Sequence, residues 1–205
     1  MLAEIINSVL VRTKNTGAQA PARACYSGEL ATSDAHARYQ EAVLQGNVYL
    51  ASNQAAVALS NLSVTATGLI LTNPVGSGKN LVIWDIDIAL ATAPAGASTV
   101  ALAANVNILA AAVIHTTPLV VRQALLGGAN AAVGLADSAA TLPAAPVVIQ
   151  ALGGGPVAAA SLTTVFMHDE VAGAIILVPG TAISLTALTT AISAVSSIMW
   201  EEVPV

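Results

Sequence analysis

Residues 80–90 read NLVIWDIDIAL, and this stretch decides the predicted fold because its side chains alternate in character. Apolar side chains occupy every second position: Val82, Trp84, Ile86, Ile88 and Leu90. Three of the four positions between them hold Asp85, Asp87 and Ala89. A period of two is typical of a β-strand that buries one face and turns the other outward. The sequence therefore predicts a strand whose buried face carries Trp84 and whose outer face carries the two carboxylates.

The same alternation recurs in short stretches along the rest of the chain, separated by Gly and Pro turns. Further strands are expected at residues 47–51, 54–60, 67–72, 99–105, 107–115, 131–135, 147–152, 162–168, 174–178, 181–189 and 196–202. Short strands spaced by roughly ten residues favour an antiparallel sandwich or barrel, and about eight to ten strands fit a jelly roll best. The predicted class is all-β, an antiparallel jelly-roll or β-sandwich. A helix inserted between strands near residues 118–127 is an alternative that the sequence leaves open.

The N-terminal part of the chain has a different pattern. Residues 1–28 show no sustained period and predict an extended arm. Residues 32–45 predict one short helix, because Thr32 or Ser33 can cap its start and Gly46 suits the position after its end. The sequence thus predicts two parts, an N-terminal arm with a short helix (1–46) and a β body (47–205).

Charge is distributed very unevenly between these two parts. Residues 1–41 carry eight of the seventeen charged side chains, and the remaining 164 residues carry nine. Hydrophobic residues make up 56% of the chain, yet aromatic residues only 3%, so small branched side chains must fill the core. A body with so little charge is expected to be covered by copies of itself or by a partner. We therefore expect a homo-oligomer, with a homotrimer as the leading form.

Composition also argues against several classes of function. No apolar run approaches the roughly 20 residues of a membrane-spanning helix, so no membrane association is expected. The start, MLAEIINSVL, has no basic segment before its apolar residues and does not resemble a secretory signal. Cys25 is the single cysteine, which excludes an internal disulfide and favours production in a reducing cytosol. A net charge of −5 argues against direct nucleic-acid binding, which depends on neutralising phosphates.

Two glycine-rich segments invite a nucleotide-binding interpretation that their context does not support. In GSGK (76–79), Asn73 stands where a phosphate loop needs its first Gly, and Asn80 follows the Lys where Ser or Thr belongs. A predicted strand follows instead of a helix, so we expect a β-turn here. GGGP (153–156) is expected to be a flexible loop and no dinucleotide site.

The acidic and histidine residues are the other candidates for chemistry. Asp85 and Asp87 share a strand face, but two carboxylates are too few for a Ca²⁺ site. Residues 168–170 read His-Asp-Glu, and neighbours on a strand point to opposite faces. A zinc site would need His115 or His36 to converge on them, which nothing in the spacing requires. No metal site and no cofactor are expected.

Hydrolytic chemistry is not expected either. A Ser-His-Asp triad would have to use His115 or His168, and the chain has no Gly-x-Ser-x-Gly segment. Cys25 lies in the predicted arm, where no rigid scaffold would activate a thiolate. The sequence therefore predicts no catalytic residue and a protein that is not an enzyme.

Several short segments resemble capsid-associated virion proteins of tailed bacteriophages. They are YQEAVLQG (39–46), SNQA (52–55), TGLILTNP (67–74), GSGKNL (76–81), VPG (178–180) and WEEVP (200–204). The resemblance spans residues 39–203, apart from the Ala-rich residues 101–160. It implies a jelly-roll protein that decorates or cements a phage head, often as a trimer, and it carries over no catalytic residue.

The expected function is that of a structural virion protein, a decoration or cement protein that stabilises a bacteriophage capsid. Its expected partners are the major capsid protein and further copies of itself, with the N-terminal arm as the docking element. It would be made in the host bacterial cytoplasm and end on the capsid surface. The alternative is a tail fibre, spike or baseplate component whose β-barrel binds a receptor or glycan.

Overall fold

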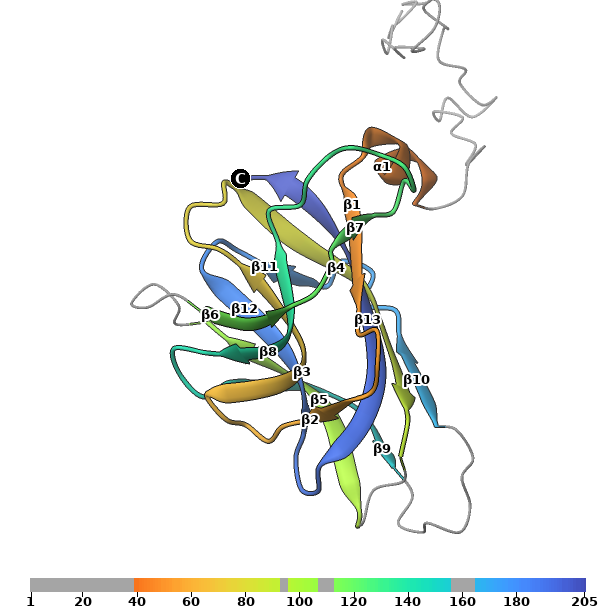
Figure 1. The fold of residues 1–205 in the computed structure, drawn as a ribbon. Coiled ribbons are helices and arrows are strands. Elements are labelled where there is room, and N and C mark those ends of the chain that lie inside the picture. Colours follow the sequence, from red (N-terminus) through yellow and green to blue (C-terminus); the bar gives the residue numbers. More distant parts are fainter. Residues whose placement is uncertain (1–38, 93–95, 107–112, 156–164) are drawn as a thin grey trace, which may run out of the picture. The chain divides into compact units, whose positions relative to one another are not determined.

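A computed structural model describes residues 39–92, 96–106, 113–155 and 165–205 of the chain (Figure 1). The chain divides into two units, Met1–Gln40 and Glu41–Val205. The predicted arm at 1–28 and the first half of the predicted helix (32–38) lie outside the described residues.

In the described residues one short helix, α1 (Gln40–Gln45), precedes a long series of strands. The strands are β1 (Val48–Ser52), β2 (Val57–Leu59), β3 (Thr65–Asn73), β4 (Lys79–Leu90), β5 (Ser98–Asn105), β6 (Ile114–Pro118), β7 (Arg122–Gln123), β8 (Leu135–Thr141), β9 (Val147–Gly155), β10 (Phe166–Asp169), β11 (Ile175–Leu177), β12 (Thr181–Ala187) and β13 (Ile192–Pro204). No helix in this part of the chain has the length and apolar character needed to cross a membrane.

The strands form two antiparallel sheets that face each other (Figure 1). The seven-stranded sheet has the order β10-β4-β13-β1-β7, with β11 also paired to β4 and β2 also paired to β13. The six-stranded sheet has the order β6-β8-β3-β12-β5-β9. The predicted all-β, antiparallel sandwich is therefore confirmed.

The main core lies between the sheets and is built from the alternating apolar positions of both. Its largest contributors include Ile86, Ile88, Ile198 and Trp200 from one sheet and Leu69, Leu71, Leu102 and Leu185 from the other. The ring of Tyr49 packs against Trp200 with a centroid separation of 6.2 Å. A smaller cluster includes Ile70, which alternates with Leu69 and Leu71 along β3 and so lies on the opposite face of that sheet.

Strand β4 departs from the predicted alternation at Trp84. Its register with β13 shifts there, because Met199 pairs with Asp85 while Trp200 pairs with Ile83. Trp84 is the extra residue of this β-bulge, and the bulge reverses which positions face the core. Ile83 is therefore buried, and the prediction that Val82 shares the buried face of Ile86 and Ile88 is wrong. Asp85 and Asp87 lie on the outer face, as predicted.

Of the other local predictions, the end of the helix at Gly46 is confirmed, whereas a second helix and the bounds of one strand differ from the structure. Gly46 follows the last helical residue with a φ of 77°, and its N–H donates to Val43 O at 3.0 Å, as expected for a residue that ends a helix. The helix considered near residues 118–127 is not formed, because β7 and a turn occupy that stretch. The strand predicted at 131–135 instead begins at Leu135 and continues to Thr141. Residues 107–112 and 162–164 of two predicted strands lie outside the described part.

Candidate functional site

Three strands bring polar side chains together on the outer face of the seven-stranded sheet. Asp87 of β4 is paired with His168 of β10 on one side and with Ser197 of β13 on the other. Asp85 lies two residues earlier on the same outer face of β4. Directly opposed residues in a sheet have neighbouring side chains, and diagonal ones are still within reach. The register alone therefore places four polar side chains in one group.

The imidazole of His168 sits between the two carboxylates. Its Nδ1 lies 2.9 Å from Asp87 Oδ1 and 3.2 Å from Asp85 Oδ1. The hydrogen bond goes to Asp87, and Asp85 Oδ1 is a buried atom without a hydrogen-bond partner. Ser197 donates from Oγ to the other oxygen of Asp87 at 3.3 Å. One ring nitrogen thus lies between two carboxylates, and the Asp85 carboxyl also has a hydrogen bond with the backbone of Ile86.

Burial, hydrogen bonding and neighbouring charges shift the pKa values of two members of this group. Burial, and next the negative charge of Asp87, raise the pKa of the Asp85 carboxyl. The hydrogen bond to Asp87, and next the charge of Asp85, raise the pKa of the His168 imidazole. Glu170 contributes negative charge to both. The group holds an excess of negative charge and is stabilised by any cation placed among its oxygens.

The edge strand β10 carries two further features next to this group. The ring of Phe166 stacks on His168, with centroids 6.4 Å apart and planes 8° apart, and is largely exposed. On the other face of the strand, Asp169 Oδ2 accepts a hydrogen bond from Gln150 Nε2 of β9 at 3.0 Å. That bond joins an edge strand of one sheet to an edge strand of the other.

A second histidine–aspartate pair lies on the six-stranded sheet. His115 Nδ1 of β6 is 2.6 Å from Asp137 Oδ2 of β8, and the Asp137 side chain is fully buried. In the part of the chain that the structure describes, no serine or threonine hydroxyl makes a hydrogen bond to His115 or His168, whose partners are aspartates. The nearby Ser138 hydroxyl donates to Thr117 O instead. The described residues thus assemble two separate acid–histidine groups, neither of which includes a hydroxyl hydrogen-bonded to the imidazole.

Lys79 of the GSGK segment has a structural role in the β body. Asn73 donates from Nδ2 to Lys79 O, and Gly76 and Gly78 have positive φ values of 76° and 68°. The segment is therefore the turn that leads into β4, as predicted. Lys79 Nζ lies 3.0 Å from Oε2 of Glu202, a fully buried carboxylate on β13. The lysine is committed to an ion pair with Glu202.

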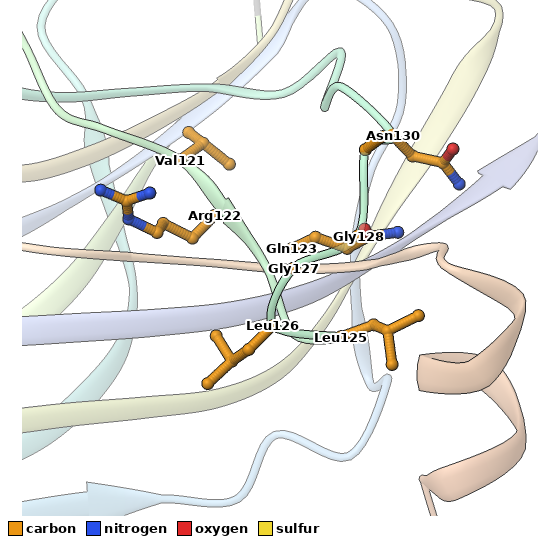
Figure 2. Close-up of a pocket in the computed structure, with 9 residues that line it drawn as sticks. Val121, Arg122, Gln123, Leu125, Leu126, Gly127, Gly128 and Asn130 are labelled. Atoms are coloured by element: carbon orange, nitrogen blue, oxygen red, sulfur yellow. The ribbon is translucent and has the colours of Figure 1, made fainter.

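A small hollow opens beside β7 and the turn that follows it (Figure 2). It measures about 290 Å³ and is lined by Val121, Arg122, Gln123, Leu125, Leu126, Gly127, Gly128, Ala129 and Asn130. The amides of Gln123 and Asn130 both donate to Gly46 O, at 2.7 and 3.3 Å. Figure 2 shows Arg122 and Asn130 on opposite sides of this loop, so they do not converge on a common ligand. The hollow is best explained as space under a loop that holds the end of α1.

The candidates chosen from the sequence are therefore only partly brought together. Asp85, Asp87 and His168 converge, whereas His115 forms a separate pair. His36 and Cys25 lie outside the described residues. The GGGP segment is not the flexible loop that was predicted, because Gly153–Gly155 form the end of β9 and pair with β5; Pro156 lies outside the described part.

The buried carboxylates Asp137 and Glu202 were missed by the sequence reasoning. Neither lies in a recognisable motif, and Glu202 stands in an alternating strand at a position that ordinarily holds an apolar side chain. That placement was the one available signal. Comparison with known proteins adds nothing to it, since no family model, no curated protein and no solved structure matches this chain.

Proposed function

We propose that this chain is a structural subunit of a bacteriophage particle, a decoration or cement protein that coats the head and stabilises it. The observation that carries the proposal is the surface of the β body, which combines very little charge with apolar side chains on the edges of both sheets. Such a surface fits an assembly of many copies better than a solvated monomer.

Fewer charged side chains are exposed to solvent in the β body than the sequence count indicates. Of the nine charged residues after Glu41, Asp137 and Glu202 are buried, and Lys79 is engaged with Glu202. Arg122 is the other basic residue of this part of the chain. A surface with so few charges has little electrostatic repulsion to keep copies apart.

Apolar side chains are exposed on strands at the edges of the sheets. On β9, the edge of the six-stranded sheet, Val147 is 69% and Ile149 48% exposed. On β6, the opposite edge of that sheet, Ile114 is 65% exposed. Monomeric proteins ordinarily protect sheet edges with charges, prolines or covering loops. Exposed apolar edges support self-association, and we propose a homotrimer.

The docking role is assigned to the N-terminal arm on the strength of the sequence. Residues 1–41 hold about half of the charge, and the runs Ile5–Ile6 and Val9–Val11 offer short apolar anchors. Ordering such a segment costs about 1–2 kcal/mol per residue, which contacts with a partner surface would have to offset. The proposed partner surface is the major capsid protein of the head.

The alternative, a tail fibre, spike or baseplate component that binds a glycan, draws support from one feature. Phe166 is 61% exposed and lies beside the carboxylates of β4, and sugar-binding sites commonly pair an aromatic face with acidic hydrogen-bond acceptors. Phe166 is the one large aromatic side chain exposed among the described residues, and one ring is a weak platform for a sugar, so this function stays second.

The test uses heads of the source phage assembled without this chain. Full-length protein added to them should bind stoichiometrically and delay DNA release on heating, whereas a chain lacking residues 1–28 should stay folded and fail to bind. Full occupancy by the truncated chain would move docking to the β body. Binding to tails and not to heads, with loss on Phe166→Ala, would favour the alternative.

A further inference from the structure

We propose that Asp85, Asp87 and His168 together bind one divalent transition-metal ion, for which Zn²⁺ is the best match. The inference does not depend on the proposed function, and it departs from the absence of a metal site expected from the sequence. It rests on the convergence of two strands that are far apart in the chain.

The three donors already have nearly the spacing that a metal requires. Zinc binds imidazole nitrogen and carboxylate oxygen at about 2.0–2.2 Å, so two ligand atoms of one tetrahedral ion lie about 3.4 Å apart. The Nδ1 of His168 is 2.9 and 3.2 Å from the two carboxylates, and the donor atoms of all three residues lie within 4.8 Å of one another. Small side-chain rotations suffice to surround an ion.

The donors come from rigid elements. Asp85 and Asp87 are outer-face positions of β4, which is paired on both sides, and His168 is directly opposite Asp87. Ser197 donates to the Asp87 oxygen that faces away from His168. A hydrogen bond of this kind orients a ligating carboxylate and supports metal affinity. The backbone holds the donors in place before any ion binds.

The two carboxylates carry more negative charge than a single protonated imidazole can neutralise. Two carboxylates share one imidazole nitrogen, and the buried Oδ1 of Asp85 has the ion-pair contact with His168 Nδ1 at 3.2 Å but no hydrogen bond. A divalent ion in the position of the His168 proton would contact both carboxylates and satisfy that oxygen.

The donor set selects the class of ion. Ca²⁺ takes six to eight oxygen ligands, and Mg²⁺ prefers oxygen and water, so an imidazole donor disfavours both. One nitrogen and two carboxylates suit Zn²⁺, with Mn²⁺ or Co²⁺ as weaker matches. Because the His168 side chain is half exposed, a fourth position is open to water. The bound ion would tie the edge strand β10 to β4.

The test is a titration of ZnCl₂ into the full chain after metal has been removed with EDTA, followed by calorimetry. We expect one equivalent of Zn²⁺, with affinity weakened at least about tenfold in His168→Gln, Asp87→Asn and Asp85→Asn. His115→Gln is the matched control, because it breaks the other histidine–aspartate pair and should bind like the wild type. At a hundredfold excess over Kd, Zn²⁺ should raise Tm by about 5–10 °C in the wild type and not in His168→Gln.

A measurement on the unmutated chain guards against variants that fail to fold. Addition of Zn²⁺ should shift the NMR resonances of the His168 ring and leave those of His115 and His36 unchanged. Co²⁺ should give a spectrum without the thiolate charge-transfer band that Cys25 ligation would produce. Unweakened binding in all three variants, shifts confined to the other histidines, or no Zn²⁺ binding at all would each overturn the proposal.

Discussion

Glu202 is fully buried at the end of β13, and its Oε2 lies 3.0 Å from Nζ of Lys79 at the start of β4. Its other oxygen accepts hydrogen bonds from the N–H groups of Val133 and Gly134, at 2.8 and 2.9 Å. The indole N–H of Trp200 lies 3.5 Å from the same oxygen. One carboxylate therefore joins two strands, a loop and the largest side chain of the core.

The first prediction concerns this carboxylate. Glu202→Ala should lower the free energy of unfolding by about 3 kcal/mol or more, because it leaves two backbone N–H groups and the Lys79 charge without a partner. Urea denaturation measures the change. The neighbour Glu201 is the control, since burial raises the pKa of its carboxyl and Glu201→Gln removes a charge that has no such partners. Equal destabilisation by the two substitutions would contradict the structural role of Glu202.

The second prediction separates two costs of replacing a glycine. Gly46 and Gly76 have nearly equal φ values, 77° and 76°. A Cβ at Gly46 would lie 2.5 Å from Gln123 Nε2, whereas one at Gly76 meets nothing within 4 Å. Gly76→Ala should therefore cost only the backbone strain of about 1–2 kcal/mol. Gly46→Ala should lower the free energy of unfolding clearly more in the same urea experiment. An effect no larger than that of Gly76→Ala would show that the Gln123 side chain moves away from the new Cβ without loss of stability.

The third prediction concerns pH in the metal-free chain. The raised pKa of His168 means that its ion pairs stabilise the folded state fully below the ordinary value of 6.5. That contribution is lost as the pH rises through the pKa of the folded state. In EDTA, the urea midpoint should fall between about pH 6 and about pH 8, and Asp87→Asn should flatten this dependence. An NMR titration in which His168 ionises at or below the ordinary value would refute the expectation.

The fourth prediction concerns self-association through the edge strand β9. Val147→Asp combined with Ile149→Asp should break the oligomer, because two charges on an edge strand oppose pairing with another copy. Light scattering of the purified chain at micromolar concentration gives the mass, expected to be three times that of one chain before the change. Val75→Asp is the control, since Val75 is similarly exposed but lies in the turn before β4. A wild-type chain that is monomeric would remove the basis of this prediction.

Much of the β body could be predicted because its signals are local. The alternation of residues 80–90 indicated a strand and placed Asp85 and Asp87 on its outer face, and Gly46 marked the end of a helix. The predictions were wrong where strand pairing, which involves residues far apart in the chain, changes the local alternation of side chains. The bulge at Trp84 reverses the faces of β4, and it exists because of how β4 pairs with β13. The two-residue strand β7 has too little sequence to show a period.

The candidate site divides in the same way. The sequence by itself determined which residues could take part, namely a pair of carboxylates two positions apart and a histidine in another strand. Only the tertiary structure decided that they meet, since His168 and Asp87 are 81 residues apart. The physical reason is that alternation reports which face a side chain takes, a property of each strand alone. Pairing and register depend on the whole core, where many similar Val, Ile and Leu strands compete for the same neighbours.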